Sequence, residues 1–515
     1  MNLLQASAIA ALLASVAPGT ASAQAEGEVI SKQYDDGSVY EGTFRNGRQD
    51  GTGTYRLPSG YEYTGAWVDG EILGQGTAHF PNGSVYQGAF VKGQPEGTGN
   101  IIFADGGTYE GDWSGGKMTG QGKASYANGA VYQGAFTNGQ HNGKGKITNP
   151  GGYTYEGDWV LGAKDGTGKI TYGDSATYEG GLVKGLRAGK ATLIMPNGLT
   201  YVGDWADGQI NGIGKLTQPN GDIYEGSFAN GKREGKGTVS FANGDSYTGG
   251  FVNDRRQGQG TFTAADGFKY EGSWVEGRME GTGLIAYPDG SVYVGAMKAD
   301  QPQGSGAITY PDGSIYQGIW DRGVILGKGR ATYTNGLIYE GAFVNAQPQG
   351  TGSMTYPDGY HYEGDWKAGQ RDGTGTATYP DGSVYKGTFK AGLRDGIGEY
   401  SMPDGFRYAG SWVAGQIEGQ GKATYPAGDI YDGAFKAGRR EGQGTLTYAS
   451  GDVATGIWQN GILSAPPEVT SATPAPEGAS ATPAPGGTSP TPAPEGASPT
   501  PAPEGAVPVE PSTNP

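Results

Sequence analysis

The sequence predicts an all-β protein, an elongated, single-layer array of about nineteen antiparallel β-hairpin units. Three observations predict this fold. A tyrosine recurs every 23 residues from Tyr40 to Tyr431 without an insertion. Between these tyrosines, glycine and apolar residues alternate with polar ones, which is the period of a strand that buries one face. Asp-Gly and Asn-Gly pairs, which favour tight turns, separate the alternating stretches.

The composition indicates a buried repeat instead of a flexible linker. Glycine accounts for 101 of the 515 residues, while 33 tyrosines and 9 tryptophans supply apolar surface. The glycines follow no three-residue period, which excludes a collagen triple helix. The lack of cysteine excludes disulfides, zinc–thiolate sites and thiol nucleophiles. Because the formal net charge is −16, neither nucleic acid nor an anionic lipid surface is an expected partner.

The first 23 residues predict a secretory signal peptide. They carry no charged side chain, are rich in Ala and Leu, and end in Ala21-Ser22-Ala23, which resembles a cleavage site before Gln24. The lack of a basic residue near the amino terminus departs from the usual pattern. We therefore expect export to the periplasm or the exterior, with an uncleaved anchor as the alternative, followed by a lead-in over residues 24–36.

The array is predicted over residues 37–463, and we number each unit from its first tyrosine. Positions 1, 3 and 5 read Tyr, Gly and Phe or Trp, and positions 12, 14 and 16 read Gly, Gly and an apolar residue. We expect the rings to lie across backbone that carries no Cβ. The structural residues of one typical unit are Tyr362, Gly364, Trp366, Gly373, Gly375 and Ala377.

The aromatic pattern predicts one packed layer with one weak place. All nine tryptophans occupy position 5, and the five alanines at position 16 occur only in tryptophan units, so we expect both positions in one layer. The unit that starts at Tyr178 departs most, with Leu182 for the aromatic residue and Ala191 for a glycine. Residues 178–200 are therefore predicted to be the least stable joint.

The run Tyr362-Glu363-Gly364-Asp365-Trp366, followed by Gly373-Thr374-Gly375 and Tyr379-Pro380-Asp381-Gly382, resembles the MORN repeat family. The resemblance covers about residues 37–460. It implies an elongated β-meander that associates with proteins or lipid headgroups. The array departs from the family pattern at Met297, which replaces an aromatic residue, and at Asp254, Asp300 and Ala346, which replace position-8 glycines. Some lipid kinases of the family carry a catalytic domain, but no segment of this chain corresponds to one.

The residues after the array, 464–515, predict a disordered tail. They are rich in Pro, Ala and Thr, and the motif TPAP recurs every nine residues from Thr473. Frequent proline prevents strand pairing and favours extended polyproline II structure. We expect a semi-stiff spacer, with a glycosylated or wall-threading stalk as the alternative.

No motif indicates catalysis, a cofactor or a metal. The glycine pairs lack the following helix that a nucleotide loop needs, and most turns offer one acid instead of a calcium-binding cluster. The three histidines, His79, His141 and His361, fall at different positions of the repeat, so we expect them on the surface. Carboxylate pairs such as Glu271 and Glu276 recur in similar form along the array, so none is singled out as a glycosidase pair.

The sequence thus predicts a non-enzymatic scaffold for protein association, including self-association through sheet edges or terminal units, in the cell envelope or outside the cell. A glycan or cell-envelope binding module and membrane-lipid association remain alternatives. Four Asp-Trp units form the expected ligand face, since Asp should face solvent beside the ring; a core Trp with a solvated Asp is the other interpretation. They are Asp112-Trp113, Asp158-Trp159, Asp204-Trp205 and Asp365-Trp366.

Overall fold

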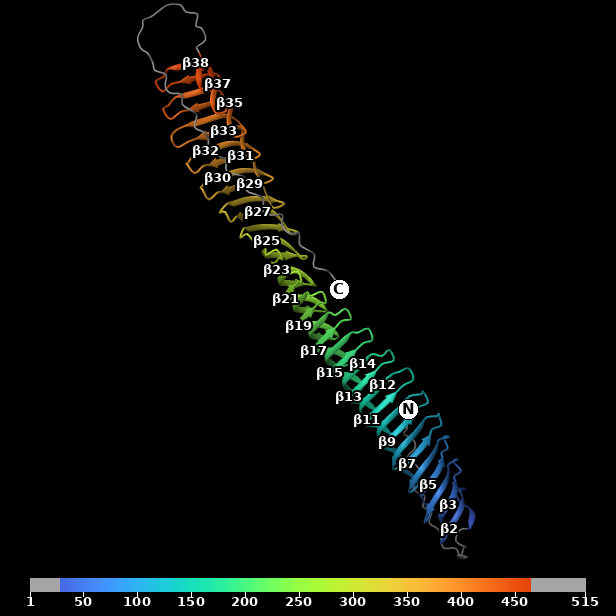
Figure 1. Cartoon of the computed structure of the whole chain (residues 1–515). Helices are drawn as coiled ribbons and strands as arrows, with labels where there is room; N and C mark the ends of the chain where they lie inside the picture. The colour runs from blue at the N-terminus through green and yellow to red at the C-terminus, as the bar shows by residue number, and fades with distance from the viewer. Residues whose placement is uncertain (1–27, 465–515) are drawn as a thin grey trace, which may run out of the picture. The chain divides into compact units, whose positions relative to one another are not determined.

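A computed structural model of the chain describes residues 28–464, which contain 39 β-strands and no helix (Figure 1). The predicted all-β array of antiparallel hairpins is confirmed. Among these residues, the structure has no helix that is long and apolar enough to span a membrane. The predicted signal peptide and residues 465–515 of the predicted tail lie outside the described residues. Residues 29–33, which lie within the predicted lead-in, form a strand.

The described residues divide into two compact units, residues 28–244 with 251–254, and residues 245–250 with 255–464. The residues of β20 (Ser246–Val252) are divided between the two. The other strands of the first unit are β1 (Val29–Gln33), β2 (Val39–Arg45), β3 (Arg48–Arg56), β4 (Glu62–Val68), β5 (Glu71–His79), β6 (Val85–Val91), β7 (Gln94–Ile102), β8 (Thr108–Ser114), β9 (Lys117–Ser125), β10 (Val131–Thr137), β11 (Gln140–Thr148), β12 (Thr154–Val160), β13 (Ala163–Thr171), β14 (Thr177–Val183), β15 (Leu186–Ile194), β16 (Thr200–Ala206), β17 (Gln209–Thr217), β18 (Ile223–Ala229) and β19 (Lys232–Ser240).

The second unit repeats the same alternation of seven- and nine-residue strands. Its other strands are β21 (Arg255–Thr263), β22 (Lys269–Val275), β23 (Arg278–Ala286), β24 (Val292–Lys298), β25 (Gln301–Thr309), β26 (Ile315–Asp321), β27 (Val324–Thr332), β28 (Ile338–Val344), β29 (Gln347–Thr355), β30 (His361–Lys367), β31 (Gln370–Thr378), β32 (Val384–Lys390), β33 (Leu393–Ser401), β34 (Arg407–Val413), β35 (Gln416–Thr424), β36 (Ile430–Lys436), β37 (Arg439–Thr447), β38 (Val453–Gln459) and β39 (Ile462–Ser464).

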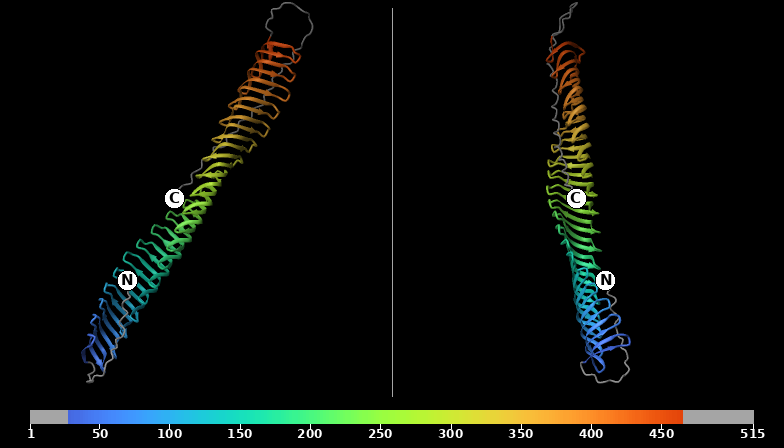
Figure 2. Two further views of the ribbon diagram at one scale, coloured as in Figure 1. Left: turned by 180° about the vertical axis from the view of Figure 1, so that it is seen from behind. Right: turned by 90° about the vertical axis from the view of Figure 1, so that its right-hand side faces the viewer.

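Each repeat is one hairpin that pairs with the hairpins before and after it. In the repeat that starts at Tyr362, this residue lies opposite Ala377, which in turn lies opposite Tyr385 of the next repeat. Figure 2 shows from two further sides that the strands of each unit follow one another in chain order. At about 4.8 Å per strand, the strands of either compact unit extend over roughly 90 Å.

Two kinds of turn join the strands. Positions 7 and 8 form a two-residue turn with both residues at positive φ, as at Asn46 (φ 47°) and Gly47 (φ 76°), which matches the twist of a hairpin. The longer turn contains the Asp-Gly or Asn-Gly pair. There only the glycine has positive φ, and the Asp side chain accepts a hydrogen bond from the backbone N–H two residues later, as Asp381 does from Ser383 at 2.9 Å.

The position-1 tyrosine lies across two glycines of its own repeat. A Cβ atom placed on Gly364 or Gly375 would lie 2.5 or 2.4 Å from the hydroxyl oxygen of Tyr362. The hydroxyl donates to the carbonyl of Asp365 at 2.9 Å, and the residue is fully buried. Positions 3 and 14 are therefore glycine for the reason that the sequence suggested.

Position 12 is glycine for a different reason. Gly373 has φ of 112°, and a Cβ there would lie 2.7 Å from the side chain of Asp365 instead of a ring. The pairing of β30 with β31 shifts register between Gly364 and Trp366. Gly373 thus belongs to a β-bulge that needs positive φ, a difference from the expectation that all three glycines lie under rings.

The aromatic rings form a ladder that is interrupted where Leu182 and Met297 replace an aromatic residue. Trp366 makes edge-on contacts with Tyr362 of its own repeat and Tyr339 of the preceding one, each with ring centroids 5.2 Å apart. Its indole nitrogen donates to the carbonyl of Gly352, the position-14 glycine of the preceding repeat, at 3.0 Å. Position 16 shares this layer, since Ala377 is fully buried.

Position 10 covers the aromatic ladder. Its arginines lie over rings, and the guanidinium carbon of Arg394 is 4.5 Å from the ring centroid of Trp412 while the residue is 3% exposed. His141 occupies the same position and stacks on Tyr132 with ring centroids 3.5 Å apart. His141 is thus half-buried instead of on the surface, and burial lowers its pKa to about 4.

One tryptophan lacks the indole hydrogen bond that the others make. Trp205 follows Ala191, the alanine at position 14, and its indole nitrogen is buried without a partner among the described residues. The tryptophans whose indole donates to the preceding position-14 glycine are Trp67, Trp113, Trp159, Trp274, Trp320, Trp366, Trp412 and Trp458. The Ala191 methyl therefore coincides with a local defect in the repeat that we predict to be least stable.

We predict that Ala191→Gly stabilises this region by about 1 kcal/mol. A buried donor without a partner costs about 1–3 kcal/mol, more than the roughly 0.5–1 kcal/mol that a strand glycine costs. Amide hydrogen exchange should slow in β15 and β16. The reverse change, Gly352→Ala, should speed exchange in β29 and β30, and unchanged or faster exchange in Ala191→Gly would contradict the argument.

We predict an acid-sensitive contribution from His141. Its folded pKa of about 4 lies below the ordinary value of 6.5, so its contribution to stability is complete above about pH 6.5 and is lost as the pH falls toward 4. His141→Met, which copies Met118 at the same position, should flatten the pH dependence of the urea midpoint over this range. His79→Met, at an exposed site, is the control, and equal flattening in both variants would disprove the assignment.

Candidate interaction surface

The face of the sheet opposite the aromatic layer is the candidate surface, and we call it the open face. It carries the side chains at positions 2, 4, 6, 13 and 15. In β12 the pattern is plain, because Tyr155 and Trp159 are buried whereas Glu156 and Val160 are exposed. This follows from the alternation of side chains along a strand. One face is therefore committed to the core, and the other remains accessible.

The four Asp-Trp units do not place a carboxylate beside an accessible ring. In each, the aspartate lies on the open face and the tryptophan lies on the buried face. The indole side chains are only 2–6% exposed (Trp113 6%, Trp159 5%, Trp205 5%, Trp366 2%). The expectation that Asp faces solvent next to the ring is thus replaced by an arrangement on opposite faces. Ligand binding at these units stays a prediction.

The aspartates of these four repeats accept hydrogen bonds from the backbone of the β-bulge. The Asp365 carboxylate accepts hydrogen bonds from the backbone N–H of Thr374 at 2.7 Å and from its hydroxyl at 2.8 Å. Corresponding backbone contacts are made by Asp112, Asp158 and Asp204. The Lys144 ammonium and the Thr167 backbone N–H together lower the pKa of Asp158. These carboxylates therefore serve first to stabilise an irregular stretch of backbone.

Cross-strand ion pairs cover the centre of the open face. They join position 15 of one repeat to position 2 of the next, as in Lys215–Glu225, with N–O 2.7 Å. Further pairs are Lys146–Glu156, Lys169–Glu179 and Arg330–Glu340. All of these side chains are at least half exposed, so each pair contributes only about 0–1 kcal/mol to stability. Their charges remain available to a partner.

Two shallow depressions lie on the open face of the first unit. One, of about 730 Å³, is lined by Lys190, Val202 and Lys215 among others. The second, of about 800 Å³, is lined by Lys144, Glu156 and Lys169 among others. Glycines form part of both floors, including Gly203 and Gly157, so the depressions follow from the same glycines that accommodate the rings.

Exposed valines form a second recurring feature, which sequence reasoning missed. They occupy position 6, directly after the buried residue at position 5, and are 42–53% exposed. They are Val68, Val91, Val160, Val183, Val252, Val275, Val344 and Val413. The sequence did contain a signal for this feature, because strand alternation places position 6 outside the core and a valine there predicts exposed apolar area.

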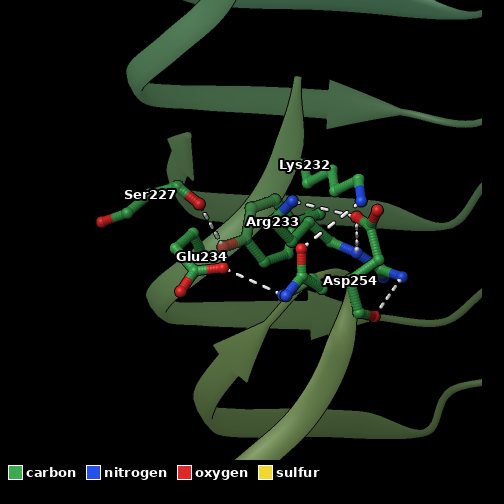
Figure 3. Close-up of polar contacts among 7 residues, drawn as sticks. Ser227, Lys232, Arg233, Glu234 and Asp254 are labelled. Carbon is green, nitrogen blue, oxygen red and sulfur yellow. Dashed lines mark hydrogen bonds and ion pairs between the residues drawn. The ribbon is translucent and has the colours of Figure 1, made fainter. Parts of the chain in front are cut away.

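Side chains at position 11 form hydrogen bonds to the next repeat, a role that the sequence did not predict. The Glu234 carboxylate accepts a hydrogen bond from the backbone N–H of Asn253 at 2.9 Å. Arg233 donates to the carbonyl of Asp254 at 2.9 Å, and Figure 3 shows these two residues side by side. Within residues 28–464, thirteen repeats make the same position-11 contact, through Asp50, Glu96, Asn142, Asp165, Glu234, Gln257, Glu280, Gln303, Gln349, Asp372, Asp395, Glu418 and Glu441. Nine of these thirteen residues are acidic, so part of the acidic charge caps the next hairpin turn.

The described residues hold no group of three or more His, Cys, Asp or Glu side chains arranged to bind a metal ion. The three histidines do not come together, and His141 is the one placed in the aromatic layer.

Known proteins that resemble this chain include Alsin over a short segment and two distantly similar solved structures. Alsin from Rattus norvegicus is 47% identical over 49 residues, and Alsin from Homo sapiens is 43% identical over 49. Each match covers 8% of this chain and 3% of the relative. The TCP domain of SAS-4 from Drosophila melanogaster, solved with a proline-rich motif of Ana2, is 15% identical with a TM-score of 0.20, over 33% of this chain and 86% of that chain. The TCP10 domain of Danio rerio CPAP is 15% identical with a TM-score of 0.15, over 51% and 96%.

The repeats themselves match one protein family, described as MORN repeat. Eighteen segments match, at residues 40–60, 63–85, 86–108, 109–131, 132–152, 155–177, 178–200, 201–223, 224–246, 247–268, 270–292, 293–315, 316–338, 339–359, 362–384, 385–407, 408–430 and 431–453. These segments include the aromatic ladder, the bulge and both turns of nearly every hairpin described above. They span well over half of the sequence, and the chain belongs to the MORN repeat family.

Proposed function

We propose that the chain is a non-enzymatic scaffold, exported to the periplasm or the exterior, whose open face binds protein partners. The observation that carries this proposal is the repetition of exposed valines and exposed ion pairs on the same face of a MORN repeat array. The proposed export rests on residues 1–23, whose sequence is typical of a signal peptide.

The chemistry of the open face suits a protein surface. The exposed position-6 valines supply apolar area, while the Lys–Glu pairs on the same face supply donors and acceptors that fix orientation. An exposed position-6 valine and a paired position-2 glutamate occur together in the repeats that start at Tyr155, Tyr178 and Tyr339. Equivalent residues of consecutive repeats lie about 9–10 Å apart, because two strands separate them. A partner with several binding segments would gain affinity from simultaneous contacts.

The burial of the tryptophans favours a protein over a glycan as the ligand. Sugar binding through aromatic residues needs an accessible ring face, whereas Trp366 and Trp412 are 2% and 1% exposed. The net charge of −16 disfavours an anionic lipid surface, because like charges repel at short range. Both points support the protein-binding proposal over the alternatives.

The first test is capture of partners by crosslinking in extracts of the native envelope. Val160→Glu with Val183→Glu should lower the amount of each specifically captured protein at least tenfold, because two charges replace apolar contact area. Leu161→Glu is the matched control, since Leu161 is an exposed apolar residue in a hairpin turn and should leave capture unchanged. Equal capture by all variants would refute the open face as the binding surface.

The second test distinguishes protein binding from glycan binding by tryptophan fluorescence. We expect emission to stay unchanged when peptidoglycan or soluble polysaccharide is added, and quenching by acrylamide to remain low until the chain is unfolded in urea. The physical reason is that the indole rings are packed against tyrosines and bonded to backbone carbonyls. A saturable emission shift with polysaccharide would favour the glycan alternative.

A further inference from the structure

The described array begins and ends in complementary half-repeats. Counting back from Tyr40, β1 falls at positions 13–17, and its Ile30 pairs with Gly42 just as Gly53 pairs with Gly65. β1 is therefore the second strand of a hairpin whose first strand is absent from the described residues. At the other end, β38 is a first strand, and β39 supplies only positions 9–11 of its partner.

The two half-repeats leave matching edges. Among the described residues, β1 pairs with β2 alone, and residues 453–456 of β38 pair with β37 alone. Unpaired strand edges of this kind are templates for another chain. β39 ends at position 11 and β1 begins at position 13, so the two segments can follow one another along β38 without overlap. Pro466 and Pro467, which occupy positions 13 and 14 in the sequence, carry no N–H donor.

Side-chain sizes at the two edges are also complementary. A Cβ at position 14 collides with the position-1 tyrosine, as the 2.4 Å distance from Gly375 to the Tyr362 hydroxyl shows. β1 carries Ile30 at position 14, which a tyrosine opposite would exclude. β38 carries Ala454 in place of that tyrosine, the single such replacement in the array. The small side chain of Ala454 at one end therefore leaves the space that the side chain of Ile30 at the other end would need.

Exposed apolar residues mark the same edges. Val29 at position 13 is 65% exposed, and Ile457 at position 4 is 55% exposed. Inside the array, side chains at these two positions of one repeat touch, as Asp158 and Thr167 do at 2.9 Å. Pairing β1 with β38 would bring Val29 against Ile457 and cover both.

We propose that the chain assembles head to tail, with β38 of one copy pairing with β1 of a second copy to complete one hairpin. The register follows that of internal repeats, with Gly456 opposite Ile30 and Val453 opposite Gln33, as Gly387 lies opposite Gly398 and Val384 opposite Ser401. The contact joins two different surfaces and leaves a free edge at each end, so repetition produces a filament. This goes beyond the proposed function, because the site is a strand edge and its occupant is the chain itself.

The proposal is tested by the mass of the full chain in solution as its concentration rises. The unaltered chain should grow into a series of multiples, seen by sedimentation velocity and as filaments by electron microscopy. Ala454→Tyr should abolish this growth, because the ring collides with Ile30 across the joint, although tyrosine is the normal residue of a folded repeat. Ile30→Gly combined with Ala454→Tyr recreates an internal pairing and should restore growth.

A second measurement identifies the surfaces in contact, since the natural chain has no cysteine. Val29→Cys mixed with Ile457→Cys should give a disulfide-linked dimer under mild oxidation. Val29→Cys mixed with Ile213→Cys, an internal exposed position, should give none. A single monomeric mass at all concentrations, growth that persists in the Ala454→Tyr variant, or equal crosslinking in both mixtures would overturn the proposal.

Discussion

The structure depends on one contact, a tyrosine ring lying flat across two opposed glycines of its own hairpin. The ring needs the space that a Cβ would fill, so positions 3 and 14 are glycine wherever position 1 is tyrosine, with Ala191 as the exception. The area that the ring buries compensates for glycines that would otherwise weaken a strand. Repeated in each hairpin, the contact produces a sheet whose own aromatic side chains cover one face.

The same contact leaves the other face for function. The rings are enclosed by neighbouring rings and by position-10 side chains such as Arg394, so they are not available as a binding platform. Many acidic side chains also accept hydrogen bonds from the backbone. Aspartates at position 4 accept from the bulge, and acidic residues at position 11 accept from the following turn. What remains accessible is a periodic pattern of valines and ion pairs. A surface with this regularity suits a partner that makes repeated contacts.

The exceptions to the pattern obey the same steric rule. Ala191 introduces a methyl where a glycine belongs, and Trp205 has no backbone carbonyl to accept its indole N–H. Ile30 and Ala454 are the exceptions at the two ends of the described array. Ile30 is a large side chain where a glycine is normal, and Ala454 is a small side chain where a tyrosine is normal. An irregular residue in a repeat array is thus informative, because the regular repeats show which contact its position normally makes.

The sequence alone determined the hairpin period, the buried aromatic face and the need for bare backbone beneath the rings, because these follow from alternation and residue size within one repeat. The separation of Asp365 and Trp366 onto opposite faces also follows from alternation, yet the bulge that engages the aspartate does not. The bulge at Gly373, the half-burial of His141 and the clamp from Glu234 to Asn253 were decided by the tertiary structure. The bulge arises from backbone register within one hairpin, and His141 is half-buried between Tyr132 of its own repeat and Trp159 of the next. The contact from Glu234 joins residues 19 apart, so its partner belongs to another hairpin.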